Sequence, residues 1–340
     1  MKKNSLDALS LKILEISNVS VYRKLLVIIL LIYSSSLSQY RYDVIDLCAA
    51  TGASYVAPFG INDSGYVVGW LTYTGNNSIA FRYKDGVVTD LGNLGLDVSI
   101  ADAININGNI VGWSLLDVMG PRHAFLYSNG NMIDIGSFSG NRDSWATDIN
   151  KSNKVVGCYH GENTGEVFAF LYNNGAVIDL GNLGEISTFA NGINDSDYIV
   201  GASAISPGVP HAFLYRNGVM TDLGNMGGQL SGAWDINSLN KIVGRFQTGN
   251  IDHAFLYDNG IVTDLGLGIA QAINDSGFIV GYVQGAQGQR AMLWKNGQSF
   301  DLNQLIDPAS GWTLIYANCS QHRRNSNPNI HSEQRLRRYL

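Results

Sequence analysis

The stretch Ile61-Asn62-Asp63-Ser64-Gly65-Tyr66-Val67-Val68-Gly69 decides the fold, because near copies of it recur along the chain. Each copy is followed by a run resembling His-Ala-Phe-Leu-Tyr, then by Asn-Gly or Asp-Gly, and then by a sequence close to Asp-Leu-Gly. The copies are separated by 43, 45, 44, 43 and 37 residues, and a repeat of this length fixes the architecture before any single motif does. The asparagines that mark the copies are Asn62, Asn105, Asn150, Asn194, Asn237 and Asn274.

Each repeat is predicted to form four short strands. The first strand ends at the Ile-Asn step, where Asx and Gly residues favour a turn. The β-branched run Tyr66 to Gly69 predicts the second strand, and the run His123 to Tyr127 predicts the third. Asn129-Gly130 then predicts a type I′ hairpin that leads into a fourth strand ending at Asp134. No stretch of the repeats keeps a helical period.

Four strands in a unit of this length are typical of a β-propeller blade. The third strand is apolar at successive positions, as expected where both faces of a sheet are buried. We therefore predict an all-β protein, a β-propeller of six to seven four-stranded blades within residues 42–318. The alternative is a β-solenoid, although solenoid coils are usually shorter and lack a tight hairpin in every repeat.

The ends of the repeat region leave the blade number open. Residues 44–47 (Val-Ile-Asp-Leu) copy the fourth strand of a blade, and residues 311–318 are a candidate first strand of a seventh blade. No Val-Gly step or Ala-Phe strand follows residue 318. The chain is thus either a six-bladed ring with a spare strand or a seven-bladed ring that lacks part of its last blade.

The repeat resembles the HAF-repeat family, the "probable extracellular repeat" proteins of bacteria. The His-Ala-Phe step that gives the family its name is present at His123, His211 and His253, and the other repeats have Ile79, Phe168 and Arg290 at this position. The resemblance covers roughly residues 42–318. It implies a secreted or surface propeller-like protein of undefined activity, and it assigns no catalytic residues. A seventh complete unit, expected from the family, is absent.

Charge and composition separate the repeats from the ends of the chain. All 39 glycines lie between Gly52 and Gly311. Residues 42–319 carry 11 Lys and Arg against 25 Asp and Glu, a formal charge of −14, whereas the two ends together carry +8. An acidic body repels phosphate backbones, so we expect no nucleic-acid binding. The acidic surface itself is interpreted as a contribution to solubility.

The N-terminal residues 1–38 are predicted to be a signal peptide or export segment. Arg23-Lys24 precedes the apolar run 25–32, and small residues follow near Ser36 and Ser38, which is the pattern of a cleaved secretory signal. The apolar run is short for a bilayer span, although an uncleaved anchor is the alternative. We expect a monomer that meets the membrane only through this segment.

The C-terminal residues 319–340 are basic and lack the repeat. We interpret them as a disordered or degenerate remnant, with a functional basic tail as the alternative. The three cysteines, Cys48, Cys158 and Cys319, have no metal-finger spacing. A disulfide between Cys48 and Cys319 would close the ring in an oxidising compartment, but we interpret the cysteines as unpaired thiols.

No catalytic, cofactor-binding or metal-binding residue is predicted. The histidines His123, His211 and His253 are each interpreted as satisfying a local backbone group in their own blade, and the alternative is that they converge on the central channel as metal ligands. The Asp that closes each repeat, as at Asp134 and Asp222, is interpreted as a turn cap, because catalytic acids break the symmetry of a repeat. The Asn-Asp-Ser-Gly turns lack the closing Glu of a calcium loop.

Function is expected in the loops between the second and third strands, which vary most. These loops are 115–122, 161–166, 203–210 and 247–252, and their Tyr, Asn and Gly content suits an unknown protein or glycan partner. The leading hypothesis is an exported, non-catalytic binding or surface-interaction module. The alternatives are a secreted propeller enzyme of the glycoside hydrolase or lyase type and a truncated, non-functional copy of a family member.

Overall fold

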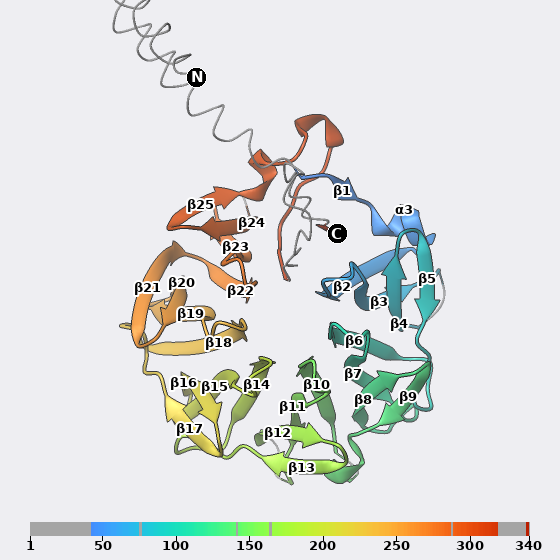
Figure 1. Ribbon diagram of the computed structural model, residues 1–340, viewed down its shortest axis with the longest axis horizontal. Helices are drawn as coiled ribbons and strands as arrows, with labels where there is room; N and C mark the ends of the chain where they lie inside the picture. The colour runs from blue at the N-terminus through green and yellow to red at the C-terminus, as the bar shows by residue number, and fades with distance from the viewer. Residues whose placement is uncertain are drawn as a thin grey trace, which may run out of the picture. The chain divides into compact units, whose positions relative to one another are not determined.

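Six four-stranded antiparallel sheets are arranged around a central channel, and the chain forms a six-bladed β-propeller (Figure 1). The computed structural model describes residues 42–74, 77–140, 142–162, 165–286 and 288–318, together with the backbone of 338–339. The predicted all-β propeller is therefore confirmed, with six blades. The predicted export segment 1–38 and Cys319, with nearly all of the predicted tail 319–340, lie outside the described residues.

The strands of each blade are hydrogen-bonded in sequence order, and the first strand lies next to the channel (Figure 1). The innermost strands are β2 (Tyr55–Ile61), β6 (Ser99–Ile104), β10 (Ser144–Ile149), β14 (Thr188–Ile193), β18 (Leu230–Ile236) and β22 (Ile269–Ile273). The second strands are β3 (Val67–Thr72), β7 (Ile110–Leu115), β11 (Val155–His160), β15 (Ile199–Ser206), β19 (Ile242–Thr248) and β23 (Ile279–Gly285). The third strands are β4 (Ile79–Lys84), β8 (Arg122–Ser128), β12 (Val167–Asn173), β16 (Val209–Arg216), β20 (Ile251–Asp258) and β24 (Gly288–Lys295). The outermost strands are β5 (Val87–Asp90), β9 (Asn131–Asp134), β13 (Ala176–Asp179), β17 (Val219–Asp222), β21 (Ile261–Leu267) and β25 (Gln298–Asp301).

The hydrophobic core lies between neighbouring blades. Phe125 on β8 is fully buried and packs with Val68 and Leu91 of the preceding blade. The same arrangement recurs around the ring, which explains why the third strand is apolar on both faces. At the tip of this blade, Asn129 and Gly130 both have positive φ values of 52° and 83°. Such values define the predicted type I′ hairpin, and equivalent pairs recur in all six blades.

Each innermost strand contains a β-bulge, and the Gly of the Val-Gly step lies opposite it. In the second blade the register shifts between Ala101 and Ala103, so Asp102 is the extra residue. A Cβ atom on Gly112 would overlap the carbonyl oxygen of Ile100. The equivalent glycine of every other blade faces the same obstacle, so the repeated glycine is required by the close approach of the bulged strand.

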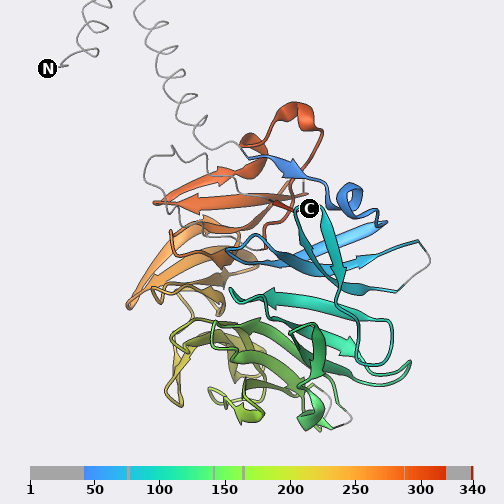
Figure 2. The same cartoon turned by 45° about the vertical axis from the view of Figure 1, so that its right-hand side comes forward.

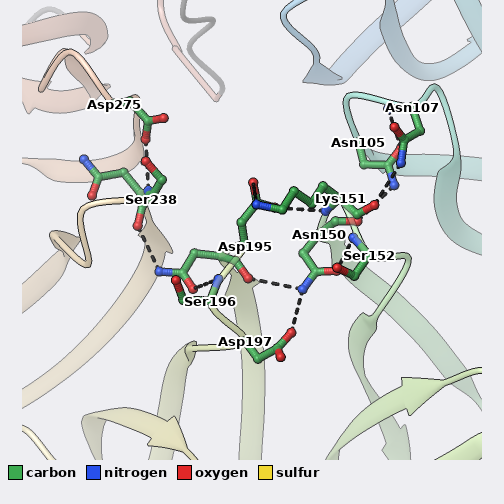
Figure 3. Close-up of polar contacts among 12 residues, drawn as sticks. Asn105, Asn107, Asn150, Lys151, Ser152, Asp195, Ser196, Asp197, Ser238 and Asp275 are labelled. Atoms are coloured by element: carbon green, nitrogen blue, oxygen red, sulfur yellow. Dashed lines mark hydrogen bonds and ion pairs between the residues drawn. The ribbon is translucent and has the colours of Figure 1, made fainter.

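The repeated asparagine joins one blade to the next (Figure 3). Asn105 Nδ2 donates a hydrogen bond to the carbonyl oxygen of Asn150 at 2.9 Å, and Asn150 Nδ2 donates to that of Asn194 at 3.2 Å. The same link runs from Asn62 to Asn105, from Asn194 to Asn237 and from Asn237 to Asn274. Meanwhile, each Oδ1 accepts backbone N–H groups of its own turn, as in Asn105 with residues 107 and 109. We call this chain of asparagines the asparagine ladder.

The segments that precede the first blade and follow the sixth blade lie where these two blades meet (Figure 1, Figure 2). Helix α3 (Leu47–Thr51) covers the first blade, and Leu47 is fully buried against it. Residues 302–318, which include η2 (Leu302–Gln304) and η3 (Pro308–Ser310), lie against the sixth blade, where Ala291 N donates to Leu314 O at 2.9 Å. The two segments meet where Tyr42 N donates to Leu305 O at 2.9 Å.

These terminal segments differ from the two strands expected from the sequence. Residues 44–47 do not form an outer strand, because Asp46 caps a helix by accepting a hydrogen bond from Ala49 N at 3.0 Å. Only β1 (Val44–Ile45) is extended, and it pairs in parallel with β26 (Arg338–Tyr339). Residues 311–318 form no strand; instead, Leu314 accepts a hydrogen bond from the sixth blade, and Asn318 lines the central channel. The segments before the first blade and after the sixth blade therefore cover the faces of these two blades.

Two cysteines lie in the described part of the chain. Cys158 is a buried thiol whose pKa is raised to about 12 by burial, and Cys48 is a half-buried free thiol. Among the described residues there is no helix with the length and apolar character needed to cross a membrane.

Candidate functional site

The central channel holds a cavity of about 520 Å³, and all six bulge residues line it. This volume falls in the range of roughly 300–1,000 Å³ that is usual for small-molecule sites. The bulge residues occupy equivalent positions, three residues before each ladder asparagine, yet no two of them are alike. They are Phe59, Asp102, Thr147, Asn191, Trp234 and Gln271. The residue type therefore differs from blade to blade at the bulge position, which faces the channel.

Asp102 is the carboxylate that lines this cavity. Burial raises the pKa of Asp102 to about 8, although the positive charge of Arg122 acts to lower it. The residue remains partly accessible from the channel, so its loss of hydration is incomplete. Among the described residues its carboxyl group has no hydrogen-bond partner. At neutral pH it therefore presents mainly a protonated carboxyl group, which donates as well as accepts hydrogen bonds.

Other polar groups of the lining also lack partners within the described part of the chain. The buried Nε1 of Trp234 is unpartnered, and the half-exposed side chain of Gln271 makes no hydrogen bond to the described residues. Asn191 Nδ2 donates to the carbonyl oxygen of Ala233 at 2.7 Å, while Asn191 Oδ1 has no such partner. Buried polar groups are normally satisfied, so the unsatisfied Nε1 of Trp234, together with the half-exposed amides of Asn191 and Gln271, suits the cavity to a polar ligand.

Arg122 lies between two tryptophans in the wall of the cavity. Its Cζ atom is 5.2 Å from the ring centroid of Trp113 and 5.4 Å from that of Trp145. Its Nε and Nη2 atoms donate to Asp143 Oδ2 at 3.0 and 2.8 Å. Burial raises the pKa of Asp143, but the hydrogen bonds and charge of Arg122 outweigh this, and the pKa lies below its usual range. The ion pair neutralises the guanidinium and holds both indoles in place.

The repeated histidines pair with the aspartates of their own blades. His123 Nδ1 lies 2.9 Å from Asp134 Oδ2, and its Nε2 lies 3.1 Å from the carbonyl oxygen of Gly140. His211 and His253 contact Asp222 and Asp264 of their own blades in the same way. The histidines therefore do not converge on the channel. Their main partner is the blade's own aspartate, rather than the backbone group that we expected.

The repeated aspartate caps a turn, as predicted. Asp134 Oδ1 accepts the backbone N–H of Gly136 at 2.8 Å, and Asp222 and Asp264 cap equivalent turns. In the described ranges, no three His, Cys, Asp or Glu side chains lie together as a metal site would require.

Two half-buried aspartates, Asp148 and Asp235, have a structural role. Asp148 Oδ2 accepts the backbone N–H of Ile193 in the next blade at 2.8 Å, and Asp235 does the same with Ile273. Burial raises the pKa of Asp148 to about 7 and that of Asp235 to about 6, while the backbone donors act to lower both values. These residues supplement the asparagine ladder and do not line the cavity.

Two of the four variable loops are shorter than the sequence indicated, because most of residues 203–210 and 247–252 belongs to strands, whereas residues 161–166 separate β11 from β12 as predicted. Residues 203–206 and 209–210 belong to strands β15 and β16, so only a two-residue turn joins them. The loop before Arg122 is longer and exposes Val118 (81%) and Met119 (95%). From the sequence, function is expected in these loops, and the channel residues are not singled out. Their signal was available: the position three residues before each ladder asparagine carries six different residue types, whereas the position just before it is alanine in five of the six repeats.

No protein-family model and no curated protein matches the chain. Among solved structures it is similar to TolB from Acinetobacter baumannii, with 17% identity, a TM-score of 0.48 and coverage of 74% of this chain and 64% of that chain. It is also similar to the acylaminoacyl peptidase of Pyrococcus horikoshii, with 11% identity, a TM-score of 0.51 and coverage of 73% and 44%. The chain thus spans less than two thirds of either protein. At these identities the likeness is one of fold alone.

Proposed function

We propose that the protein is a non-catalytic binding module that holds a small ligand in the cavity of its central channel. The observation that carries the proposal is the loss of repeat symmetry at the six bulge positions. A purely structural channel needs no such variation, whereas a ligand with distinct groups requires distinct partners. The resemblance to HAF-repeat proteins and the signal-like residues 1–38 lead us to propose further that it is an exported member of that family.

A catalytic role is the second candidate, because Asp102 has the raised pKa expected of a general acid. Hydrolysis of a glycosidic bond, however, normally requires two carboxyl groups that flank the bond. Asp102 is the sole carboxylate among the described residues that line the cavity. Its surroundings therefore favour binding over hydrolysis.

A screen that compares two variants tests the proposal. Gln271→Trp narrows the channel with the residue that the fifth blade carries at the equivalent position, Trp234, so we expect it to fold. Val118→Ser alters the exposed loop and leaves the cavity unchanged. The probes are neutral sugars, sugar acids, nucleosides, amino acids and organic amines, tested by the rise in Tm that binding produces.

We expect one class of probe to raise the Tm of the wild-type protein and of Val118→Ser but not of Gln271→Trp. If no probe binds, or if Val118→Ser loses binding while Gln271→Trp retains it, the channel is not the site. Conversion of a bound probe to product by the wild-type protein would replace the binding role with a catalytic one. N-terminal sequencing of protein recovered outside the cell tests the proposed export.

A further inference from the structure

We infer that the ligand of the channel is a neutral carbohydrate, bound through one or two pyranose rings. This inference rests on the proposed binding function and names its ligand class. It follows from three properties of the cavity: the kinds of polar group that it offers, its aromatic rings, and its lack of an uncompensated charge.

The free polar groups of the cavity match hydroxyl groups in particular. Gln271 offers both a donor and an acceptor, Asn191 Oδ1 offers an acceptor, and the indole of Trp234 offers a donor. Asp102 on β6 adds a carboxyl group, and β6 lies across the channel from β18, the strand that carries Trp234 (Figure 1). A hydroxyl group both donates and accepts, so a polyhydroxylated ring can satisfy this mixed set from several directions.

Aromatic rings supply the second half of the match. Phe59, Trp113, Trp145 and Trp234 all line the cavity. The C–H face of a pyranose ring is apolar, and contact with an aromatic ring removes it from water. Arg122 lies between Trp113 and Trp145 and packs against both rings. Rings that are already ordered lose little conformational entropy when the ligand binds.

The charge of the lining disfavours ionic ligands. The Arg122 guanidinium is paired with Asp143 through two hydrogen bonds. An anionic ligand would meet a guanidinium whose charge Asp143 already neutralises, and would bring a second negative charge close to that carboxylate. A cationic ligand would meet Arg122 itself, the charged side chain that acts on Asp102. A neutral ligand encounters neither penalty.

Isothermal titration calorimetry with defined glycosides tests the inference. Methyl glycosides of neutral hexoses represent single sugar units, and the corresponding oligosaccharides represent chain ends. Glucuronic acid, glucosamine and nucleosides are the comparison probes. We expect a neutral glycoside to bind, and Gln271→Met, which keeps the size of the side chain but removes its hydrogen bonds, to weaken binding about tenfold. Val118→Ser is the matched control and should bind like the wild-type protein.

The arms of the experiment separate the possible sources of the ligand and the two levels of the proposal. Binding of oligosaccharides alone would identify a glycan chain, and equal binding of methyl glycosides would identify a single sugar unit; both support the inference. If a charged probe or a nucleoside binds and Gln271→Trp abolishes it, the channel is a binding site but the carbohydrate inference is overturned. If Gln271→Trp changes the binding of none of the probes, both the inference and the proposed function fail. The Tm of Gln271→Met, measured in parallel, confirms that the variant is folded.

Discussion

Asn105 Nδ2 donates a hydrogen bond to the carbonyl oxygen of Asn150, 45 residues later in the chain, at a distance of 2.9 Å. Asn105 Oδ1 at the same time accepts the backbone N–H groups of its own turn. One side chain thus fixes a turn within a blade and links that blade to the next. This double use explains why asparagine recurs at every Ile-Asn step (Figure 3).

Replacement of a ladder asparagine by aspartate should weaken the ring. In Asn105→Asp the acceptor oxygen is retained, but the donor to Asn150 is lost and a buried carboxylate faces a carbonyl oxygen. We expect a loss of about 1–3 kcal/mol in the free energy of unfolding, measured by urea denaturation. Asn131→Asp on the exposed strand β9 is the control and should change stability little. Equal stability of the two variants would show that the ladder does not stabilise the ring.

The glycine opposite the bulge should not tolerate a methyl group. In Gly112→Ala the new Cβ would overlap the carbonyl oxygen of Ile100, so the bulged strand that carries Asp102 must move. We expect a loss of about 1–3 kcal/mol in unfolding free energy by thermal denaturation. Gly232→Ala is the matched control, because its Cβ would meet only the Cβ of Ala202 at 3.5 Å, an ordinary contact. A Gly112→Ala protein as stable as Gly232→Ala would contradict the close approach seen here.

The helix that covers the first blade should contribute to the stability of the ring. Leu47 is fully buried among Val56, Val67 and Phe81, so Leu47→Ala would leave a cavity in this cluster. We expect a loss of about 2–5 kcal/mol in unfolding free energy. The neighbouring Ala50 is exposed, and Ala50→Ser serves as the control. If Leu47→Ala unfolds like the control, the cap is not part of the cooperative unit.

The stability of the protein should fall as pH rises, in a way that depends on Asp102. The pKa of this carboxyl group is about 8 in the folded protein and about 3.9 in an unfolded chain. Between these values the folded state holds the proton that the unfolded state has lost. The folded state is therefore progressively destabilised from about pH 4 to about pH 8, and the full cost is present above pH 8.

Asp102→Asn removes this titration. Because the channel admits some water, the gain in unfolding free energy at pH 9 should be on the order of 1–3 kcal/mol, less than complete burial would give. The gain should shrink as the pH is lowered toward 4. Urea denaturation of both proteins across this range provides the measurement. Parallel pH profiles for wild-type and variant would mean that Asp102 titrates normally.

The sequence predicted the architecture well because the features that define a blade are local and repeated. The Asn129-Gly130 pair, for example, requires nothing beyond its own backbone to specify the hairpin. The terminal segments were predicted less well, since Leu47 is helical only because a cap at Asp46 and an uncovered blade face are both present. The channel cavity was not predicted from the sequence, because Asp102 and Trp234 line a common cavity only when the ring closes. The variation in residue type at their position of the repeat is, however, visible in the sequence.

The claim that the channel binds a ligand is tested most directly by the indole N–H resonances of the six tryptophans in a two-dimensional ¹H–¹⁵N spectrum. Trp234 lines the cavity with an unpartnered Nε1, and Trp234→Phe assigns its resonance. Trp294 is an internal control, because its Nε1 is already bonded to the carbonyl oxygen of Leu265 at 3.0 Å. When the neutral glycoside that binds in calorimetry is added, the Trp234 resonance should shift saturably while that of Trp294 stays in place. A Trp234 resonance that does not move at saturating glycoside would place the ligand elsewhere and contradict the account.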